Sequence, residues 1–195
     1  MRLWVLSDWH MEQRIVFDPP RPAFDVLVVA GDVSDLITRS IRMVSALAAG
    51  KPAVFVAGNH EWWAGPETIA EKRDAAQFAA QKHSVHFLEG DAVDIAGVRF
   101  AGATLWTPDD ARFVPSVRSL AAARADVIVT HFEPTPAMMT QVGGALWIYG
   151  HHHGHGYRRL GDRRIVRNAL GYAHEPLYDG LPAIPDYTIR IGEPR

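Results

Sequence analysis

Short apolar runs alternate with amphipathic segments along the first three quarters of the chain. The runs are rich in Val, Ile, Leu and Ala, which is typical of strands buried in a sheet, and they predict strands at 3–6, 26–30, 53–57, 98–103, 127–130 and 145–149. Apolar positions at helical spacing predict a helix that begins at Leu36 and ends before Gly50. Pro66 suits the first turn of a second helix, over 66–83, and a third is expected over 115–124.

The last quarter of the chain has a different pattern. Residues 157–160 and 164–167 flank Gly161-Asp162, which predicts a hairpin with a two-residue turn, and 187–191 predicts a final strand. Neither a repeat nor a linker interrupts the pattern. Strands alternating with helices are typical of a layered α/β protein, and 195 residues suit one core. We therefore expect a single domain over residues 1–195.

Polar side chains follow five of the predicted strands, at the point where each strand ends. They are Asp8 and His10, Asp32, Asn59 and His60, His131, and finally the run His151-His152-His153. In open α/β sheets the functional crevice lies outside the carboxyl ends of the strands. We therefore expect these scattered residues to converge on one site.

The chemistry of these residues indicates a metal centre. Asp, His and Asn without any Cys form a mixed oxygen and imidazole set, which suits Mn, Fe, Zn or Co, with Mn our first expectation. The set exceeds what one ion needs, whereas two divalent ions about 3.5–4 Å apart, sharing a carboxylate, would use it fully. The spacing of Asp8 and His10, and of His151 and His153, places each pair on one side of extended backbone, with His152 pointing away. The spacing alone leaves His153 with His155 as an alternative pair.

Five motifs in this order resemble the signature of the calcineurin-like metallophosphoesterases. They are Asp8-x-His10, Gly31-Asp32-x-x-Asp35, Gly58-Asn59-His60-Glu61, the isolated His131 and Gly150-His151-x-His153. The tail Asn168-Ala-Leu-Gly171-Tyr172 is also similar to a segment of small bacterial members. The resemblance implies a four-layer α-β-β-α sandwich with two mixed β-sheets and a metal site at the carboxyl-terminal ends of the strands.

The resemblance also implies a role for each site residue. One metal ion would be held by Asp8, His10, Asp32 and His153, and the other by Asp32, Asn59, His131 and His151, with Asp32 as the bridge. His60 would donate a proton to the leaving group and Asp35 would orient it, which agrees with general acid chemistry beside a carboxylate. A hydroxide shared by the two metals would attack phosphorus in line, without a phosphoenzyme.

The expected function is hydrolysis of a small phosphate ester, with monoester and diester both open. Glu133 places a carboxylate near His131 and would disfavour highly anionic substrates. The alternatives are a non-catalytic protein-binding scaffold on the same fold, or a metal-dependent nuclease. The formal net charge of −2 argues against a nucleic-acid partner. No apolar run is long enough to span a membrane, and residues 2–7 read as a strand rather than a signal peptide, so we expect a cytoplasmic protein without membrane association.

Several residues near these motifs have no clear role from sequence. Trp62 and Trp63 follow the third motif and would either stack on a substrate or pack in the core. Arg14 and Arg158 flank site loops and would contact a phosphate or remain surface charges. No role is assigned to His152 or His155, and the oligomeric state is left open.

Overall fold

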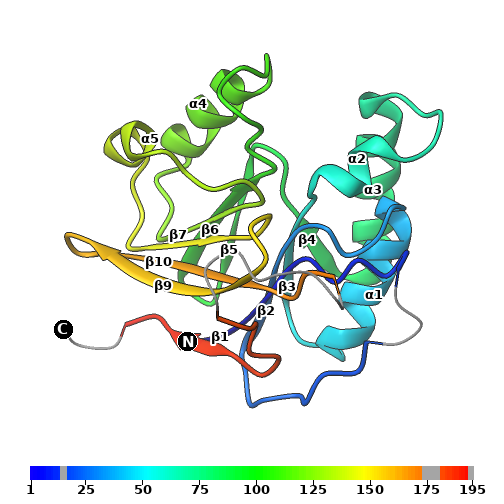
Figure 1. Cartoon of the computed structure of the whole chain (residues 1–195), viewed down its shortest axis with the longest axis horizontal. Coiled ribbons are helices and arrows are strands. Elements are labelled where there is room, and N and C mark those ends of the chain that lie inside the picture. The colour runs from blue at the N-terminus through cyan, green and yellow to red at the C-terminus, as the bar shows by residue number, and fades with distance from the viewer. Residues whose placement is uncertain (14–16, 173–180, 193–195) are drawn as a thin grey trace.

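We describe the protein from a computed structural model, which places residues 1–13, 17–172 and 181–192. Within these ranges, two β-sheets lie face to face and helices cover the outer face of each (Figure 1). This is the expected four-layer α-β-β-α arrangement of two mixed sheets. None of the helices in these ranges is both long and apolar enough to cross a membrane.

The first sheet contains five strands in the order β11-β1-β2-β3-β4. The strands β1 to β4 run parallel, and β11 pairs with β1 in the antiparallel direction. Their bounds are β1 Arg2–Leu6, β2 Val26–Ala30, β3 Ala53–Val56, β4 Val85–Phe87 and β11 Thr188–Arg190. The parallel strands bring the carboxyl ends of β1, β2 and β3 to one edge.

The second sheet contains six strands in the order β5-β6-β7-β8-β10-β9. The four central strands are parallel, while β5 and β9 are antiparallel to their neighbours. Their bounds are β5 Asp91–Ile95, β6 Val98–Ala103, β7 Val127–Thr130, β8 Leu146–Tyr149, β9 Gly154–Leu160 and β10 Arg163–Ala169. A single bridge from Ser7 to Ala169 joins the two sheets where β1 and β10 end.

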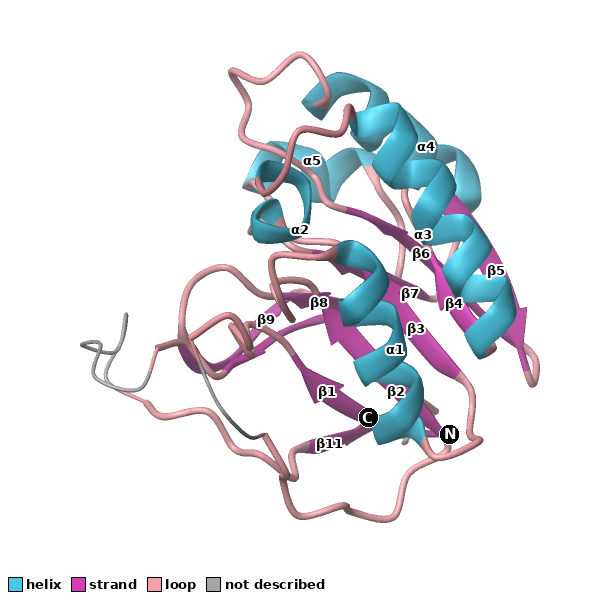
Figure 2. Cartoon of the chain, turned by 90° about the vertical axis from the view of Figure 1, so that its right-hand side faces the viewer, coloured by secondary structure: helices cyan, strands magenta, loops and turns pink. Residues whose placement is uncertain are grey.

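Five helices form the outer layers of the described structure. They are α1 Ile37–Ala48, α2 Asn59–Trp63, α3 Ile69–His83, α4 Phe113–Ala123 and α5 Pro136–Gln141. The helices α1 and α3 pack on the first sheet, whereas α4 and α5 lie on the second (Figures 1 and 2). In α1 the apolar residues Ile37, Ile41 and Val44 form the buried stripe that the helical spacing predicts.

Side chains alternate along each strand between two different cores. In β1, Leu3 and Val5 pack between the sheets, while Trp4 and Leu6 face the helices. The same alternation in β8 sends Ile148 into the core between the sheets and Trp147 toward α4 and α5. Central strands such as β2 and β8 are therefore buried on both faces, which explains why they read as continuous apolar runs.

The sequence predicts the long elements well and misses the short ones. All six apolar runs form strands within one residue of the expected bounds, and Gly161-Asp162 forms the turn between β9 and β10. The strands β4 and β5 and the helices α2 and α5 were not expected. The second helix begins at Ile69 rather than near Pro66, because Thr68 caps it by accepting a hydrogen bond from the Glu71 amide.

Candidate metal centre

The first group of potential ligands combines Asp8 and His10 from the end of β1 with His153 from the end of β8. The Nε2 atoms of His10 and His153 lie 3.1 Å apart, and the His153 Nε2 is 3.5 Å from the Asp8 Oδ1. Both Asp8 and His10 are almost fully buried. These are three of the four residues that the sequence assigns to one metal ion.

The second group combines Asp32 from the end of β2, His131 from the end of β7 and His151 from the end of β8. The His131 Nε2 lies 3.4 Å from the Asp32 Oδ2 and 2.9 Å from the Asn59 Oδ1. The His131 Nδ1 contacts the carbonyl oxygen of Ala30 at 2.8 Å, which leaves Nε2 facing the site. All four residues that the sequence assigns to the second ion therefore lie together.

Asp32 lies between the two groups. Its Oδ2 is 3.9 Å from the His10 Nε2 and 3.4 Å from the His131 Nε2, and the carboxylate is almost fully buried. Its Oδ1 accepts a hydrogen bond from the backbone amide of His60 at 2.9 Å. This central position is the one that a bridging carboxylate requires.

The backbone at the ligands is left-handed rather than extended. Positive φ angles occur at Asp8 (57°), His10 (47°), Asp32 (52°) and His151 (65°). The expectation that extended backbone aligns the paired ligands was therefore wrong, although the side chains do converge. Left-handed geometry costs roughly 1–2 kcal/mol per non-glycine residue, and such strain concentrates at functional sites.

Two glycines allow the site loops to approach one another closely. A Cβ atom at Gly58 would lie 2.1 Å from the Asp32 Oδ1, and a Cβ atom at Gly150 would lie 2.6 Å from the Asp8 Oδ2. Any side chain at either position would displace a ligand carboxylate. These glycines of the sequence motifs are therefore required by the packing of backbone against ligand.

The buried carboxylate of Glu61 holds the site loops together. Its Oε2 accepts hydrogen bonds from the backbone amides of Asp32 and Gly58, at 3.0 and 2.8 Å. Its Oε1 accepts from the amides of Val33 and Ser34 and from the Ser40 hydroxyl, at 2.8, 3.3 and 2.8 Å. One side chain thus joins the loop after β2, the loop after β3 and the first turn of α1.

The charges of the buried site favour a bound cation. Burial and the charge of Asp32 raise the pKa of Glu61, so the two carboxylates repel one another. Burial opposes protonation of His131, yet the charge of Asp32 and a hydrogen bond to it raise the pKa of His131 to about 9. Burial and the neighbouring charge of His131 lower the pKa of His151 to about 4. The negative charge of Asp32 therefore favours protonation of His131, and the positive charge of His131 disfavours protonation of His151.

The donor set fits divalent metal ions. Two imidazole nitrogens that face one another at 3.1 Å cannot both present lone pairs there unless a proton or a cation lies between them. The ligating atoms of each group lie within 4.8 Å of one another, and they combine carboxylate oxygen with imidazole nitrogen. Such a set matches Mn, Fe, Zn or Co better than Ca, which prefers more oxygen ligands.

His60 lies beside both groups. Its Nε2 is 4.0 Å from the Asp32 Oδ2 and 3.3 Å from the Tyr172 hydroxyl, while its Nδ1 is 3.1 Å from the Glu12 Oε1. The hydrogen bond to Glu12 outweighs partial burial and raises the pKa of His60. Asp35 is half-buried, and among the described residues it makes no hydrogen bond or ion pair with His60. Its orienting role stays a prediction.

A family comparison agrees with this geometry. Residues 1–155 match the family model described as calcineurin-like phosphoesterase, and the matched range contains both ligand groups. The chain belongs to the calcineurin-like phosphoesterase family. The matched range also contains all five sequence motifs.

Solved structures share the fold of this calcineurin-like phosphoesterase. The phosphopantetheinyl hydrolase PptH from Mycobacterium tuberculosis is 17% identical, with a TM-score of 0.60, over 93% of this chain and 95% of that one. A Staphylococcus aureus protein assigned provisionally as a 5′-nucleotidase is 13% identical, with a TM-score of 0.53, over 85% of this chain. The chain spans 48% of that protein. A sequence comparison with curated proteins found no match.

Other residues singled out in the sequence lie outside the two ligand groups. His152 points toward Glu133, with 3.5 Å between the His152 Nε2 and the Glu133 Oε2. The His155 Nδ1 contacts the Asn168 Oδ1 at 3.3 Å, away from His153. Arg158 forms an ion pair with Glu133 at 2.6 Å. Arg14 lies outside the described residues.

The two adjacent tryptophans have different environments. Trp62 is buried and donates a hydrogen bond from Nε1 to the Thr104 hydroxyl at 2.8 Å, so it packs in the core. Trp63 is 66% exposed, and its ring centroid lies 6.1 Å from that of His60. Of the two, Trp63 is the one exposed beside His60.

Sequence analysis gave no role to three residues that the structure brings to the site. Glu12 contacts both His10 and His60, Glu61 ties the loops, and the Tyr172 ring lies 4.2 Å from the His10 ring. Glu61 and Tyr172 belong to the third motif and to the tail segment, so their place in these motifs could have indicated a role at the site. Glu12 stands two residues after His10, as His10 stands two residues after Asp8, and this spacing was the sequence signal for Glu12.

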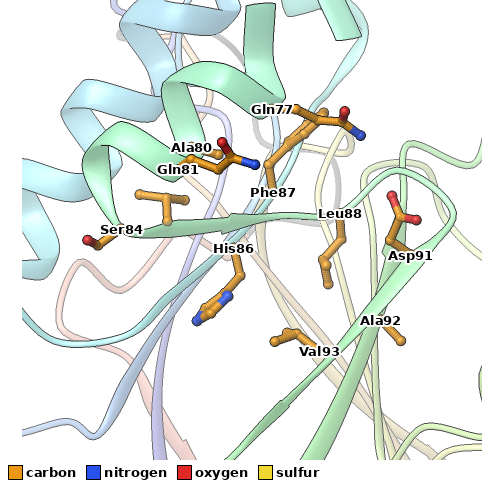
Figure 3. A pocket seen from close by; sticks show the side chains of 11 residues that line it. Gln77, Ala80, Gln81, Ser84, His86, Phe87, Leu88, Asp91, Ala92 and Val93 are labelled. Atoms are coloured by element: carbon orange, nitrogen blue, oxygen red, sulfur yellow. The ribbon is translucent and has the colours of Figure 1, made fainter. Parts of the chain in front are cut away.

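A cavity lies away from this centre. It has a volume of about 700 Å³ and opens between the end of α3 and the edge strands β4 and β5 of the two sheets. His86, Leu88 and Val93 point into the space between these strands (Figure 3). Because it contains none of the ligands, the cavity does not define the functional site.

We expect Glu61→Gln to destabilise the protein by about 2–4 kcal/mol, because an amide group must turn a donor toward one of the donors that surround Glu61. Chemical denaturation measures this free energy of unfolding. The matched control is Glu71→Gln, where an exposed carboxylate accepts hydrogen bonds from Thr68, and its effect on the free energy of unfolding should be much smaller. Equal effects of the two substitutions would contradict the role given to Glu61.

Proposed function

We propose that this protein is a dinuclear metal-dependent hydrolase of small phosphate esters. The observation that carries the proposal is the meeting of two ligand groups at one carboxylate: Asp32 lies within 4.0 Å of His10 on one side and of His131 on the other. A single ion does not need seven such ligands, whereas two ions sharing Asp32 use them all. The proposal covers monoesters and diesters.

The ligand assignment follows the two groups. Asp8, His10 and His153 would hold one ion and Asn59, His131 and His151 the other, with Asp32 contacting both. Bound divalent ions would neutralise phosphate charge and activate water for in-line attack. The protein residues position those ligands: Ala30 orients His131, and the amide of His151 donates to Asp8 at 3.1 Å.

His60 is proposed as the proton donor to the leaving oxygen. Its Nδ1 is engaged by Glu12, so Nε2 is the atom that faces the site. The ring is 25% exposed, which leaves access for a substrate. Exposed Trp63 beside it offers a flat apolar surface for the leaving group.

The arrangement of the arginines supports a small substrate rather than a nucleic acid. Arg158 is paired with Glu133, and Arg163 donates to the carbonyl oxygens of Met139, Val142 and Gly144 at the end of α5. Among the described residues, these arginines of the β9–β10 hairpin therefore provide structural contacts and form no open basic stripe beside the ligands. Nucleic-acid binding would require such a stripe.

We expect Asp32→Asn to lower metal content below two ions per chain, because the neutral amide weakens contacts to both sites. His152→Ala, which alters a histidine directed toward Glu133 instead, should retain the wild-type content. Elemental analysis after dialysis compares the two variants. Equal loss in both, or loss in neither, would contradict the ligand assignment.

We expect the metal-loaded protein to hydrolyse phosphate esters, to lose this activity with a chelator and to regain it with Mn more readily than with Ca.

His60→Gln should slow the hydrolysis of alkyl esters by about 10²–10⁴-fold and that of nitrophenyl esters far less, because an alkoxide needs a proton to leave. The measurement is kcat/KM over esters that differ in leaving-group pKa, with metal content checked. A uniform loss for every ester would exclude the proton-donor role, and an inert wild-type protein would favour the binding scaffold.

A further inference from the structure

We infer that Glu12 is the positioning residue of this site, holding the metal ligand His10 and the proton donor His60 through one carboxylate oxygen. The Glu12 Oε1 lies 2.9 Å from the His10 Nδ1 and 3.1 Å from the His60 Nδ1. The inference rests on the proposed function, because it specifies what sets the orientation of His60 in that reaction.

The contacts fix which nitrogen of each ring faces the site. A carboxylate oxygen only accepts hydrogen bonds, so each imidazole must donate to it from a protonated Nδ1. The Nε2 of His10 is then free to present a lone pair toward Asp8, Asp32 and His153. The Nε2 of His60 faces Asp32 and Tyr172, where it can carry the proton that the proposed reaction requires. Outer partners of this kind set the tautomer and the direction of ligating histidines.

The surroundings of Glu12 make it suited to this task. Its side chain is 16% exposed and lies between a His10 ring that is 1% exposed and a His60 ring that is 25% exposed. The two rings meet edge to face, with centroids 4.5 Å apart, so a shift of one ring displaces the other. The backbone supports the arrangement, because the Met11 amide donates to the carbonyl oxygen of Val33 at 2.9 Å and anchors the loop to the Asp32 segment.

Asp35 is the rival candidate for the same role, since the family motif gives it the partnership with His60. In the described structure the carboxylate that contacts the His60 Nδ1 belongs to Glu12, and Asp35 has no hydrogen bond or ion pair to the ring. Glu12 reaches His60 from the β1 loop, whereas Asp35 stands just before α1. If Glu12 orients His60, substituting Glu12 should change the tautomer of the ring. If Asp35 orients it, substituting Asp35 should do so.

A second rival is direct metal binding by Glu12, because Glu12, His10 and His60 also form a group whose ligating atoms lie within 4.8 Å of one another. In that arrangement the Nδ1 atoms would carry lone pairs rather than protons. The protonation state of Nδ1 therefore separates positioning from ligation.

The first test is the imidazole nitrogen spectrum of the ¹⁵N-labelled, metal-free protein at alkaline pH. We expect His60 and His10 to carry the proton on Nδ1 in the wild type. Glu12→Ala should shift His60 toward the Nε2-protonated form that an unrestrained neutral histidine side chain prefers, whereas Glu12→Gln, which keeps an acceptor oxygen, should preserve the wild-type tautomer. Asp35→Ala should leave the His60 tautomer unchanged.

The matched control for the spectra is Glu133→Ala, which removes a carboxylate from a different carboxylate–histidine pair, with His152. It should leave the His60 signals as in the wild type. The inference is overturned if His60 carries its proton on Nε2 in the wild type, if Glu12→Ala leaves the tautomer unchanged, or if Asp35→Ala alters it. Should Glu12→Ala fail to fold, the wild-type tautomer and the Asp35→Ala spectrum still test the inference.

The second test is the leaving-group dependence of the metal-loaded variants. Glu12→Ala should lower kcat for alkyl esters about 10- to 100-fold more than for nitrophenyl esters, with partial recovery in Glu12→Gln. An equal loss for all esters at full metal content would overturn the inference. If the wild type hydrolyses no ester, the proposed function fails, and the tautomer measurement still decides the role of Glu12.

Discussion

The geometry of this site depends on five hydrogen bonds to one buried carboxylate. Glu61 accepts from three consecutive amides after β2, from Gly58 after β3 and from Ser40 in α1. Without that acceptor, buried amides would lose their partners, and the loops that carry Asp32 and Asn59 would separate. Packing of the two sheets brings five strand ends to one edge, but Glu61 sets the spacing of the loops beyond them. The positions of Asp32 and Asn59 follow from that spacing.

The strain in the ligand loops is the counterpart of this constraint. Left-handed backbone at Asp8, His10, Asp32 and His151 is unfavourable in isolation, and surrounding hydrogen bonds and sheet packing maintain it. The same backbone turns carboxylates and imidazoles from separate strands toward a shared centre. The like charges of Asp32 and Glu61 and the close approach of the His10 and His153 rings then make this centre poor as a protein core and well suited to divalent cations. The strained backbone lowers the local stability of the loops, and it also places the potential metal ligands around one centre.

Sequence predicts the elements that are buried and the residues that carry chemistry, but not the loops between them. Central strands such as β2 are recognisable because both faces are apolar, whereas β5 is missed because Asp91 and Asp94 are exposed on an edge. The seven proposed ligands are recognisable from their positions after strands and from the family motifs. The contact of Glu12 with His60 depends on how the β1 loop turns, and left-handed angles at Asp and His have no signal in composition.

The central claim is that two metal ions share this site, and electron paramagnetic resonance of the Mn-loaded wild-type protein tests it most directly. Two Mn²⁺ ions bridged by one carboxylate are magnetically coupled, and isolated ions are not. The account predicts two Mn²⁺ ions per chain and the spectrum of a coupled pair. One ion per chain, or two ions with the six-line spectrum of isolated Mn²⁺, would contradict it.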